Sequence, residues 1–443
     1  MQIQLSEHFT YDKLLRFVFP SIVMMIFTSI YSVVDGLFVS NYAGKTALAS
    51  INLVFPILMA LSALGFMMGT GGSAIVAKTL GEGDHKKANE IFSLLVYTTA
   101  IGGVILSVIG AITIPFFARL LGAKGVLLTN CIVYARITFI SMPAFMLQNV
   151  FQSFFVTAEK PKLGLYVILT AGITNIVLDF LFVGILGFGL YGAAAETVCG
   201  EFIGGLFPLL YFGRKNSSLL RLGKTHFNAR ILLQTCGNGS SELMSNLSIS
   251  IVTSLYNVQL MKFAGENGVA AYGAIMYVSF VFAAIFIGYS IGSAPVISFH
   301  YGAGNHDELK NLFGKSLRLI ALCGLFLAVF SQVLAIPLSK LFVGYDAELY
   351  TMTRNAFRIY CLVYLFNGFN IFGSSFFTAL SNGGISAAIS FLRTLVFQVA
   401  AVLILPMILG MNGIWFAVIV AELLTLVITV TFFLLKRKKY HYA

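Results

Sequence analysis

The chain has 443 residues, of which 58% are hydrophobic and only 10% are charged. Soluble domains carry about 25% charged residues, so the composition excludes a soluble enzyme and indicates a membrane protein with several spans. The net charge of +11 does not indicate a nucleic-acid partner, because basic loops that face anionic lipid headgroups explain it in a membrane protein.

Twelve apolar segments follow one another, each with about 20 or more mostly apolar residues, which is enough to cross a bilayer. They cover residues 14–40, 47–79, 89–117, 126–157, 162–187, 190–213, 229–262, 268–301, 310–340, 347–380, 385–410 and 412–435. We therefore expect an all-α membrane protein with an N-terminal six-helix lobe (residues 1–213), a cytoplasmic linker (214–228) and a C-terminal six-helix lobe (229–443).

The second half of the chain repeats the first. Gly81 aligns with Gly302, and Glu201 with Glu422, both at an offset of 221 residues. Each half has an even number of spans, so both halves enter the membrane from the same side. The repeats are therefore parallel and related by an axis along the membrane normal, and the space between two such bundles is where substrates pass.

The positions of Lys and Arg predict the orientation. With both termini inside, most of the 28 Lys and Arg residues fall in the inner segments, among which we count Arg393. The sequence thus predicts a multi-pass protein of the plasma (inner) membrane with both termini in the cytoplasm. We expect it to act as a monomer among membrane lipids.

Acidic side chains inside spans are energetically costly and are therefore candidates for function. Asp35 lies late in the first span. Asp179 lies in the fifth span, where Asn175 precedes it by four residues and shares its helix face. The equivalent positions in the second half hold Tyr256, Val396 and Ala400. Because only one repeat has this acid–amide cluster, we expect a coupling-ion site in the N-terminal lobe.

The sequence leaves two coupling ions open. Burial disfavours the charged form of a carboxylate, so Asp35 or Asp179 can bind a proton near neutral pH. Alternatively, Asp35, Asn175, Asp179 and Thr197 of the sixth span supply the oxygens that ligate Na⁺.

Two glutamates of the sixth span are harder to assign. Glu201 has a twin in Glu422, which predicts a shared structural role near the inner end of the spans. Glu196 has no acidic twin, since Ala417 occupies that position, and it is only a candidate contact for substrate or ion.

Three further side chains are candidate contacts for substrate or ion. Tyr31 lies one helical turn before Asp35, and Tyr256 occupies the position of Asp35 in the second repeat. Glu242 opens the seventh span after the run Gly237–Ser241, whose small and turn-forming residues predict a broken helix.

No Walker A motif Gly-x-x-x-x-Gly-Lys-Ser/Thr occurs in the chain, so the chain is not itself an ATP-driven pump. We expect neither enzymatic activity nor a cofactor.

The chain resembles the multidrug and toxic compound extrusion (MATE) transporters, and in particular their bacterial MepA-like group. The resemblance covers essentially the whole chain and rests on Asp35-Gly36, Asn175-x-x-x-Asp179 and the run Gly189-Leu-Tyr-Gly-Ala-Ala-Ala-Glu-Thr197. It implies a V-shaped fold and alternating access, with efflux of organic cations or other amphipathic compounds in exchange for H⁺ or Na⁺. The cation site of the family's N-lobe falls on Asp35, Asn175, Asp179 and Thr197.

Two positions depart from the family pattern. Some members carry an acid in span ten, whereas Tyr360–Phe377 has none. Glu196 stands where the family usually has a small or neutral residue.

The sequence therefore predicts a secondary antiporter for cationic or amphipathic small molecules. A first alternative is a flippase for lipid-linked saccharides, which shares the two-lobe plan but needs cationic residues in its cavity to hold pyrophosphate. A second is a receptor or scaffold that does not transport.

Overall fold

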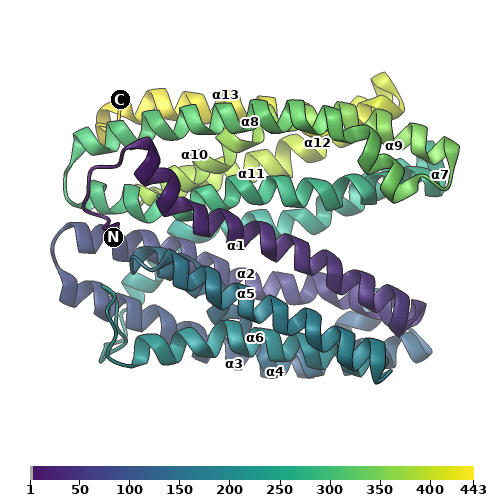
Figure 1. Cartoon of the computed structure of the whole chain (residues 1–443), viewed down its shortest axis with the longest axis horizontal. Coiled ribbons are helices and arrows are strands. Elements are labelled where there is room, and N and C mark those ends of the chain that lie inside the picture. The colour runs from purple at the N-terminus through teal and green to yellow at the C-terminus, as the bar shows by residue number, and fades with distance from the viewer. Residues whose placement is uncertain (1–2) are drawn as a thin grey trace.

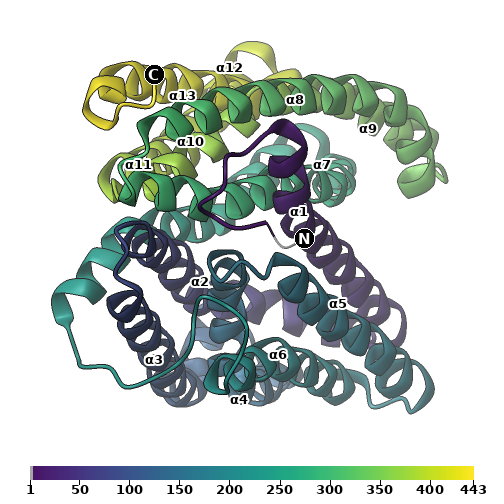
Figure 2. The same ribbon diagram turned by 60° about the vertical axis from the view of Figure 1, so that its left-hand side comes forward.

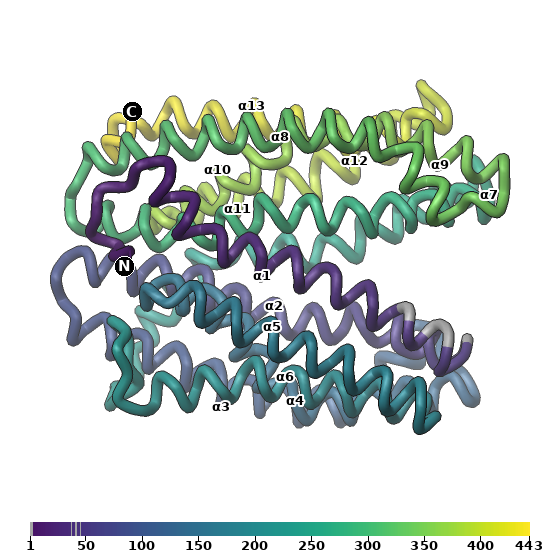
Figure 3. The backbone as a smooth tube through the Cα atoms, in the orientation of Figure 1, coloured from purple at the N-terminus to yellow at the C-terminus, as the bar shows by residue number. Residues whose placement is uncertain are grey.

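The computed structural model describes residues 3–443, apart from the side chains of Leu37, Ser40, Asn41 and Lys45, and these residues form a helical bundle without a strand. Two layers of helices lie along the long axis (Figure 1). We call α1–α6 the N-lobe and α7–α13 the C-lobe. Both chain termini lie at one end of the bundle, here the termini end (Figures 1 and 3). The lobes lie close together there and separate towards the opposite, far end.

The N-lobe helices follow the predicted spans closely. Two of them continue as π-helical segments, named η. Their bounds are α1 Tyr11–Phe38 with η1 Val39–Ala43, α2 Lys45–Gly81, α3 His85–Leu120, α4 Gly125–Thr157, α5 Pro161–Leu178 with η2 Asp179–Ile185, and α6 Gly189–Gly213.

The C-lobe begins with one helix of 74 residues, α7 Ala229–Gly302, which contains two spans separated by the non-helical backbone of Gly265 (φ 59°, ψ −147°). The other elements are α8 His306–Val343, α9 Ala347–Tyr360, the 3₁₀ segment η3 Cys361–Leu365, α10 Asn367–Ala379, α11 Gly383–Phe391, the π-helical η4 Leu392–Phe397, α12 Gln398–Leu409 and α13 Met411–Tyr440. With α7 divided at Gly265, the eleven long apolar helices give the twelve predicted spans. The prediction of a multi-pass, all-α membrane protein is confirmed.

Polar side chains fix where many helices begin. The side chains of Asp84 and Asn305, which are repeat equivalents, each accept a hydrogen bond from a backbone N–H in the first turn of α3 and α8. Such caps satisfy donors that a helix start leaves unpaired. Asn228 does the same for α7, so that helix starts directly after the polar stretch 214–228.

The predicted break before Glu242 is wrong, because α7 runs unbroken through Gly237–Ser241. The glycines serve close packing instead. A Cβ atom on Gly239 would lie 2.0 Å from the Met67 carbonyl oxygen of α2. Small residues let helix backbones approach this closely in membrane proteins.

The two lobes meet through a reciprocal glycine contact at the termini end. A Cβ on Gly81 would lie 2.0 Å from the Phe299 carbonyl oxygen, and one on Gly302 would lie 2.0 Å from the Lys78 carbonyl oxygen. Gly81 and Gly302 are repeat equivalents. The contact therefore sits across the pseudo-twofold axis and holds α2 against α7.

We expect Gly302→Ala to separate the lobes at the termini end, because overpacking against a backbone carbonyl costs about 1–3 kcal/mol. Spin labels introduced through Glu82→Cys and Ala303→Cys, both exposed loop positions, should report a larger share of long distances. Gly102→Ala is the matched control, since a Cβ there meets nothing within 4 Å. Equal distance distributions for the two alanine variants would contradict the expected effect.

Candidate cation-coupling site

Three carboxylates from three helices meet inside the N-lobe. Asp35 of α1, Asp179 at the start of η2 and Glu196 of α6 each place one oxygen within 4.8 Å of the other two. Asp179 and Glu196 are 0% exposed, and Asp35 is partly buried. The structure therefore brings together the two aspartates that the sequence singled out and adds Glu196 to them.

The local backbone explains how these side chains reach one another. Gly172 of α5 faces the rings of Phe27 and Tyr31, and a Cβ there would lie 2.5 Å from the Phe27 ring. The missing side chain lets α1 approach α5, so that Asp35, further along α1, reaches Asp179. At Asp179 the helix changes from α to π geometry, a rare feature that is frequent at functional sites.

Amide and hydroxyl groups complete the cluster. The Asn175 amide donates a hydrogen bond to one Glu196 oxygen, and the Thr197 hydroxyl lies 2.6 Å from the other. Thr197 thus touches Glu196, while its predicted contact with an ion stays a prediction. Both Asp179 oxygens and the Asn175 side-chain oxygen are buried and have no hydrogen-bond partner. These acceptors lack the donor or cation that buried oxygens require.

Among the side chains that the structure describes, which leave out Leu37, Ser40, Asn41 and Lys45, no ion pair includes Asp35, Asp179 or Glu196. Like charges this close, in a site shielded from water, disfavour simultaneous ionisation. The chemistry of the donor set therefore suits a bound proton or a hard cation such as Na⁺.

The remaining candidate contacts lie in different places. Tyr31 lies beside the cluster, within electrostatic reach of Asp35 and Glu196. Tyr256 is 1% exposed in the C-lobe core and stacks on Tyr272 with ring centroids 5.0 Å apart. Glu242 is partly buried on α7 of the C-lobe. The structure does not bring Tyr256 or Glu242 to the cluster.

The prediction of a shared role for Glu201 and Glu422 is wrong, because the two glutamates have different partners. Glu201 accepts a hydrogen bond from Ser141 at 2.5 Å. Glu422 accepts two from Arg393, whose Nε and Nη2 each lie 2.7 Å from one oxygen, and one from the Asn370 amide at 2.7 Å. The repeat equivalent of Arg393 is Gly172, so only the C-lobe glutamate has a built-in cation.

Sequence reasoning missed the partner of Arg393 and the place of Glu196. Arg393 lies in the π-helical segment η4, within the predicted span 385–410, and pairs with Glu422. The available signal was a basic residue in an apolar run, together with the intramembrane acid Glu422 in the next span. For Glu196 the signal was its missing acidic twin, the criterion that had selected Asp35 and Asp179.

Known proteins share this architecture. The family model described as MatE matches the chain twice, at residues 20–181 and 243–404. The multidrug export protein MepA of Staphylococcus haemolyticus is 24% identical over 94% of this chain and 92% of its own length. The probable multidrug resistance protein YoeA of Bacillus subtilis is 26% identical over 76% and 74%, respectively.

A crystal structure of a MATE protein in complex with MaL6 superposes with a TM-score of 0.91, at 24% identity over 98% of this chain and 97% of that one. This likeness shows a shared fold. Because the family model matches more than half of the chain, and the MepA proteins match nearly all of it, the chain belongs to the MatE family of multidrug and toxic compound extrusion transporters and to its MepA-like group.

Proposed function

We propose that this protein is a secondary multidrug efflux antiporter of the plasma membrane, with both termini in the cytoplasm. It exports cationic or amphipathic organic compounds in exchange for H⁺ or Na⁺. The observation that carries this proposal is the cluster of Asp35, Asp179 and Glu196, three converging carboxylates without a basic partner among the side chains that the structure describes. The export activity named for the MepA relative supports the same substrate class.

The acid cluster links ion binding to substrate release. A proton or Na⁺ that enters from the outside binds at Asp35 and Asp179, cancels one of their negative charges and weakens their attraction for a cationic substrate, which then leaves outward. The lobes rock, the ion is released into the cytoplasm, and the recharged carboxylates favour the next substrate. Coupling requires that the ion bind the two lobe arrangements with different affinity.

The charge distribution favours a cationic substrate over a lipid-linked pyrophosphate. A flippase for such lipids needs free cationic side chains in its cavity. Arg393, the basic residue of span eleven, is paired with Glu422, whereas the clustered acids Asp35, Asp179 and Glu196 have no ion-pair partner among the described side chains. The antiporter therefore agrees better with the charges of both lobes.

Uptake of a fluorescent lipophilic cation into inside-out proteoliposomes tests the proposal. A proton gradient and a sodium gradient are imposed separately, with empty liposomes as the control. We expect uptake under one of the two gradients, which identifies the coupling ion. Absence of uptake under both gradients, with folded protein in the membrane, would reject drug–ion antiport.

A further inference from the structure

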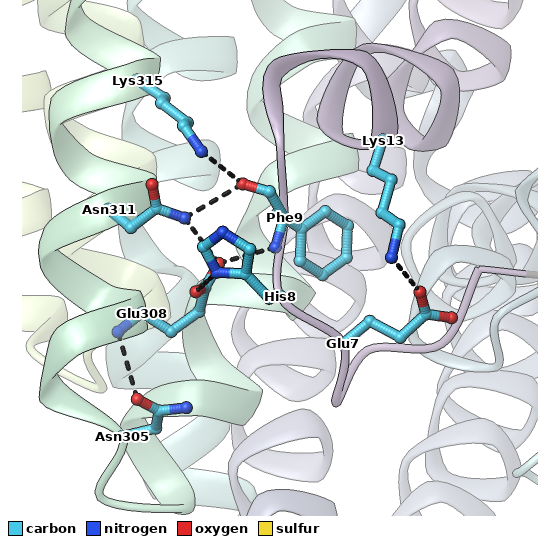
Figure 4. Close-up of polar contacts among 8 residues, drawn as sticks. All are labelled: Glu7, His8, Phe9, Lys13, Asn305, Glu308, Asn311 and Lys315. Atoms are coloured by element: carbon cyan, nitrogen blue, oxygen red, sulfur yellow. Dashed lines mark hydrogen bonds and ion pairs between the residues drawn. The ribbon is translucent and has the colours of Figure 1, made fainter.

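Residues 3–10, here called the N-terminal strap, precede α1 and lie across the termini end of the molecule (Figures 2 and 4). The side chains of Leu5 and Phe9 are 0% exposed. Both belong to a hydrophobic core built mainly from C-lobe residues, which also contains Val156 of the N-lobe. The strap is therefore packed into the protein at the place where the two lobes meet.

Polar contacts anchor the strap to α8 of the C-lobe. Glu308 accepts the Phe9 backbone N–H at 2.9 Å, and its second oxygen lies 2.6 Å from Nδ1 of His8. The Phe9 carbonyl oxygen accepts hydrogen bonds from Asn311 at 3.0 Å and from Lys315 at 2.6 Å. Figure 4 shows these side chains converging on His8 and Phe9 from one face of the helix.

A separate hydrogen bond connects the strap to the N-lobe. The backbone N–H of Leu5 donates to a Glu159 side-chain oxygen at 2.6 Å. Glu159 lies in the turn between α4 and α5 and has a left-handed backbone (φ 59°). One short segment of eight residues thus holds a loop of one lobe and a helix of the other.

The internal repeat offers a natural comparison. The linker 214–228 precedes α7 as the strap precedes α1, and it crosses α3 as the strap crosses α8: Thr225 donates to the Glu90 carbonyl oxygen at 2.8 Å, and Glu90 is the repeat equivalent of Asn311. Apart from the bonds by which Asn228 caps the adjoining helix α7, none of the hydrogen bonds found within residues 3–443 joins this linker to the C-lobe. Of these two segments, only the strap therefore bonds to a loop of one lobe and a distant helix of the other.

We propose that the N-terminal strap is a latch that keeps the termini end closed by tying Glu159 of the N-lobe to Glu308 of the C-lobe. Any motion that separates the lobes at this end must break one of the two attachments. This inference rests on the alternating access of the proposed function.

The test compares Glu159→Gly with Ser381→Gly. Ser381 lies in the corresponding turn of the C-lobe, between α10 and α11, and has the same left-handed backbone (φ 56°), so both glycines relieve the same strain while only one removes the latch. With spin labels at positions 82 and 303, and without substrate or gradient, we expect the long-distance population to rise about tenfold in Glu159→Gly, as for loss of one hydrogen bond to a charged group. Ser381→Gly should match the parent protein.

A second pair of variants cuts the other attachment. Glu308→Ala should also raise the long-distance population, whereas Asp307→Ala, which removes an exposed acid from the same first turn of α8, should not. If Gly302→Ala opens the termini end and neither Glu159→Gly nor Glu308→Ala does, the latch is rejected while alternating access stands. If no variant opens this end, both proposals fail.

Discussion

Replacing Asp179 with asparagine should strongly reduce ion-driven transport without lowering stability. Asp179 is fully buried, and neither of its oxygens has a hydrogen-bond partner. The neutral amide removes a desolvated charge, and burying a polar group costs far less than burying an unpaired charge. We expect gradient-driven uptake to fall roughly tenfold or more, in line with coupling free energies of 1–3 kcal/mol, while the apparent melting temperature stays equal or rises.

Asp35→Asn should give the same loss of uptake, because Asp35 shares the site. Asp12→Asn is the matched control on the same helix: its side chain is 66% exposed and pairs with Arg16 at the surface. Uptake by Asp179→Asn at the level of the parent protein would show that the cluster does not couple ion and substrate. A loss of uptake accompanied by a large fall in melting temperature would instead indicate a structural role.

The second large effect is expected in the C-lobe, where Arg393→Gln should strongly destabilise the protein. Glu422 has a side chain that is 7% exposed and accepts both donors of Arg393. Without the arginine, the buried Glu422 carboxylate is left with the hydrogen bond from the Asn370 amide. Breaking a buried ion pair from one side costs about 3–5 kcal/mol, which thermal unfolding in detergent can measure.

The double variant Arg393→Gln/Glu422→Gln separates the lost charge balance from lost packing. It should recover most of the stability, because the amide that replaces the Glu422 carboxylate carries no charge. Arg358→Gln serves as the control for an arginine, since that side chain is exposed. A double variant no more stable than Arg393→Gln alone would contradict the electrostatic explanation.

Hydropathy was sufficient to predict the spans of this protein because each span is long and apolar throughout. It could not predict how helices deviate inside a span. The π-helical segments at Asp179 and Leu392, and the 3₁₀ segment at Cys361, preserve the length and hydrophobicity of their spans. A pattern that counts apolar residues therefore cannot detect these segments.

The candidate site was predictable as far as the repeat revealed it. Asp35 and Asp179 were found because their twins are not acidic, and the structure places them together. The contact of Glu196 with Asn175 depends on which faces of α5 and α6 meet, and the pairing of Arg393 with Glu422 depends on the depth of η4 in its span. Neither of these two contacts can be predicted from the sequence of a single helix.

The reciprocal contact of Gly81 and Gly302 has a consequence for the origin of the chain. In an isologous dimer interface, every contact occurs twice, because the same two residues meet again with the subunits exchanged. The two glycine contacts have this form. In a half-length chain that paired with itself, both glycines would be one residue, and a single substitution would change both contacts at once. In the joined chain the two halves can vary independently, and here one holds the acid cluster and the other holds Arg393.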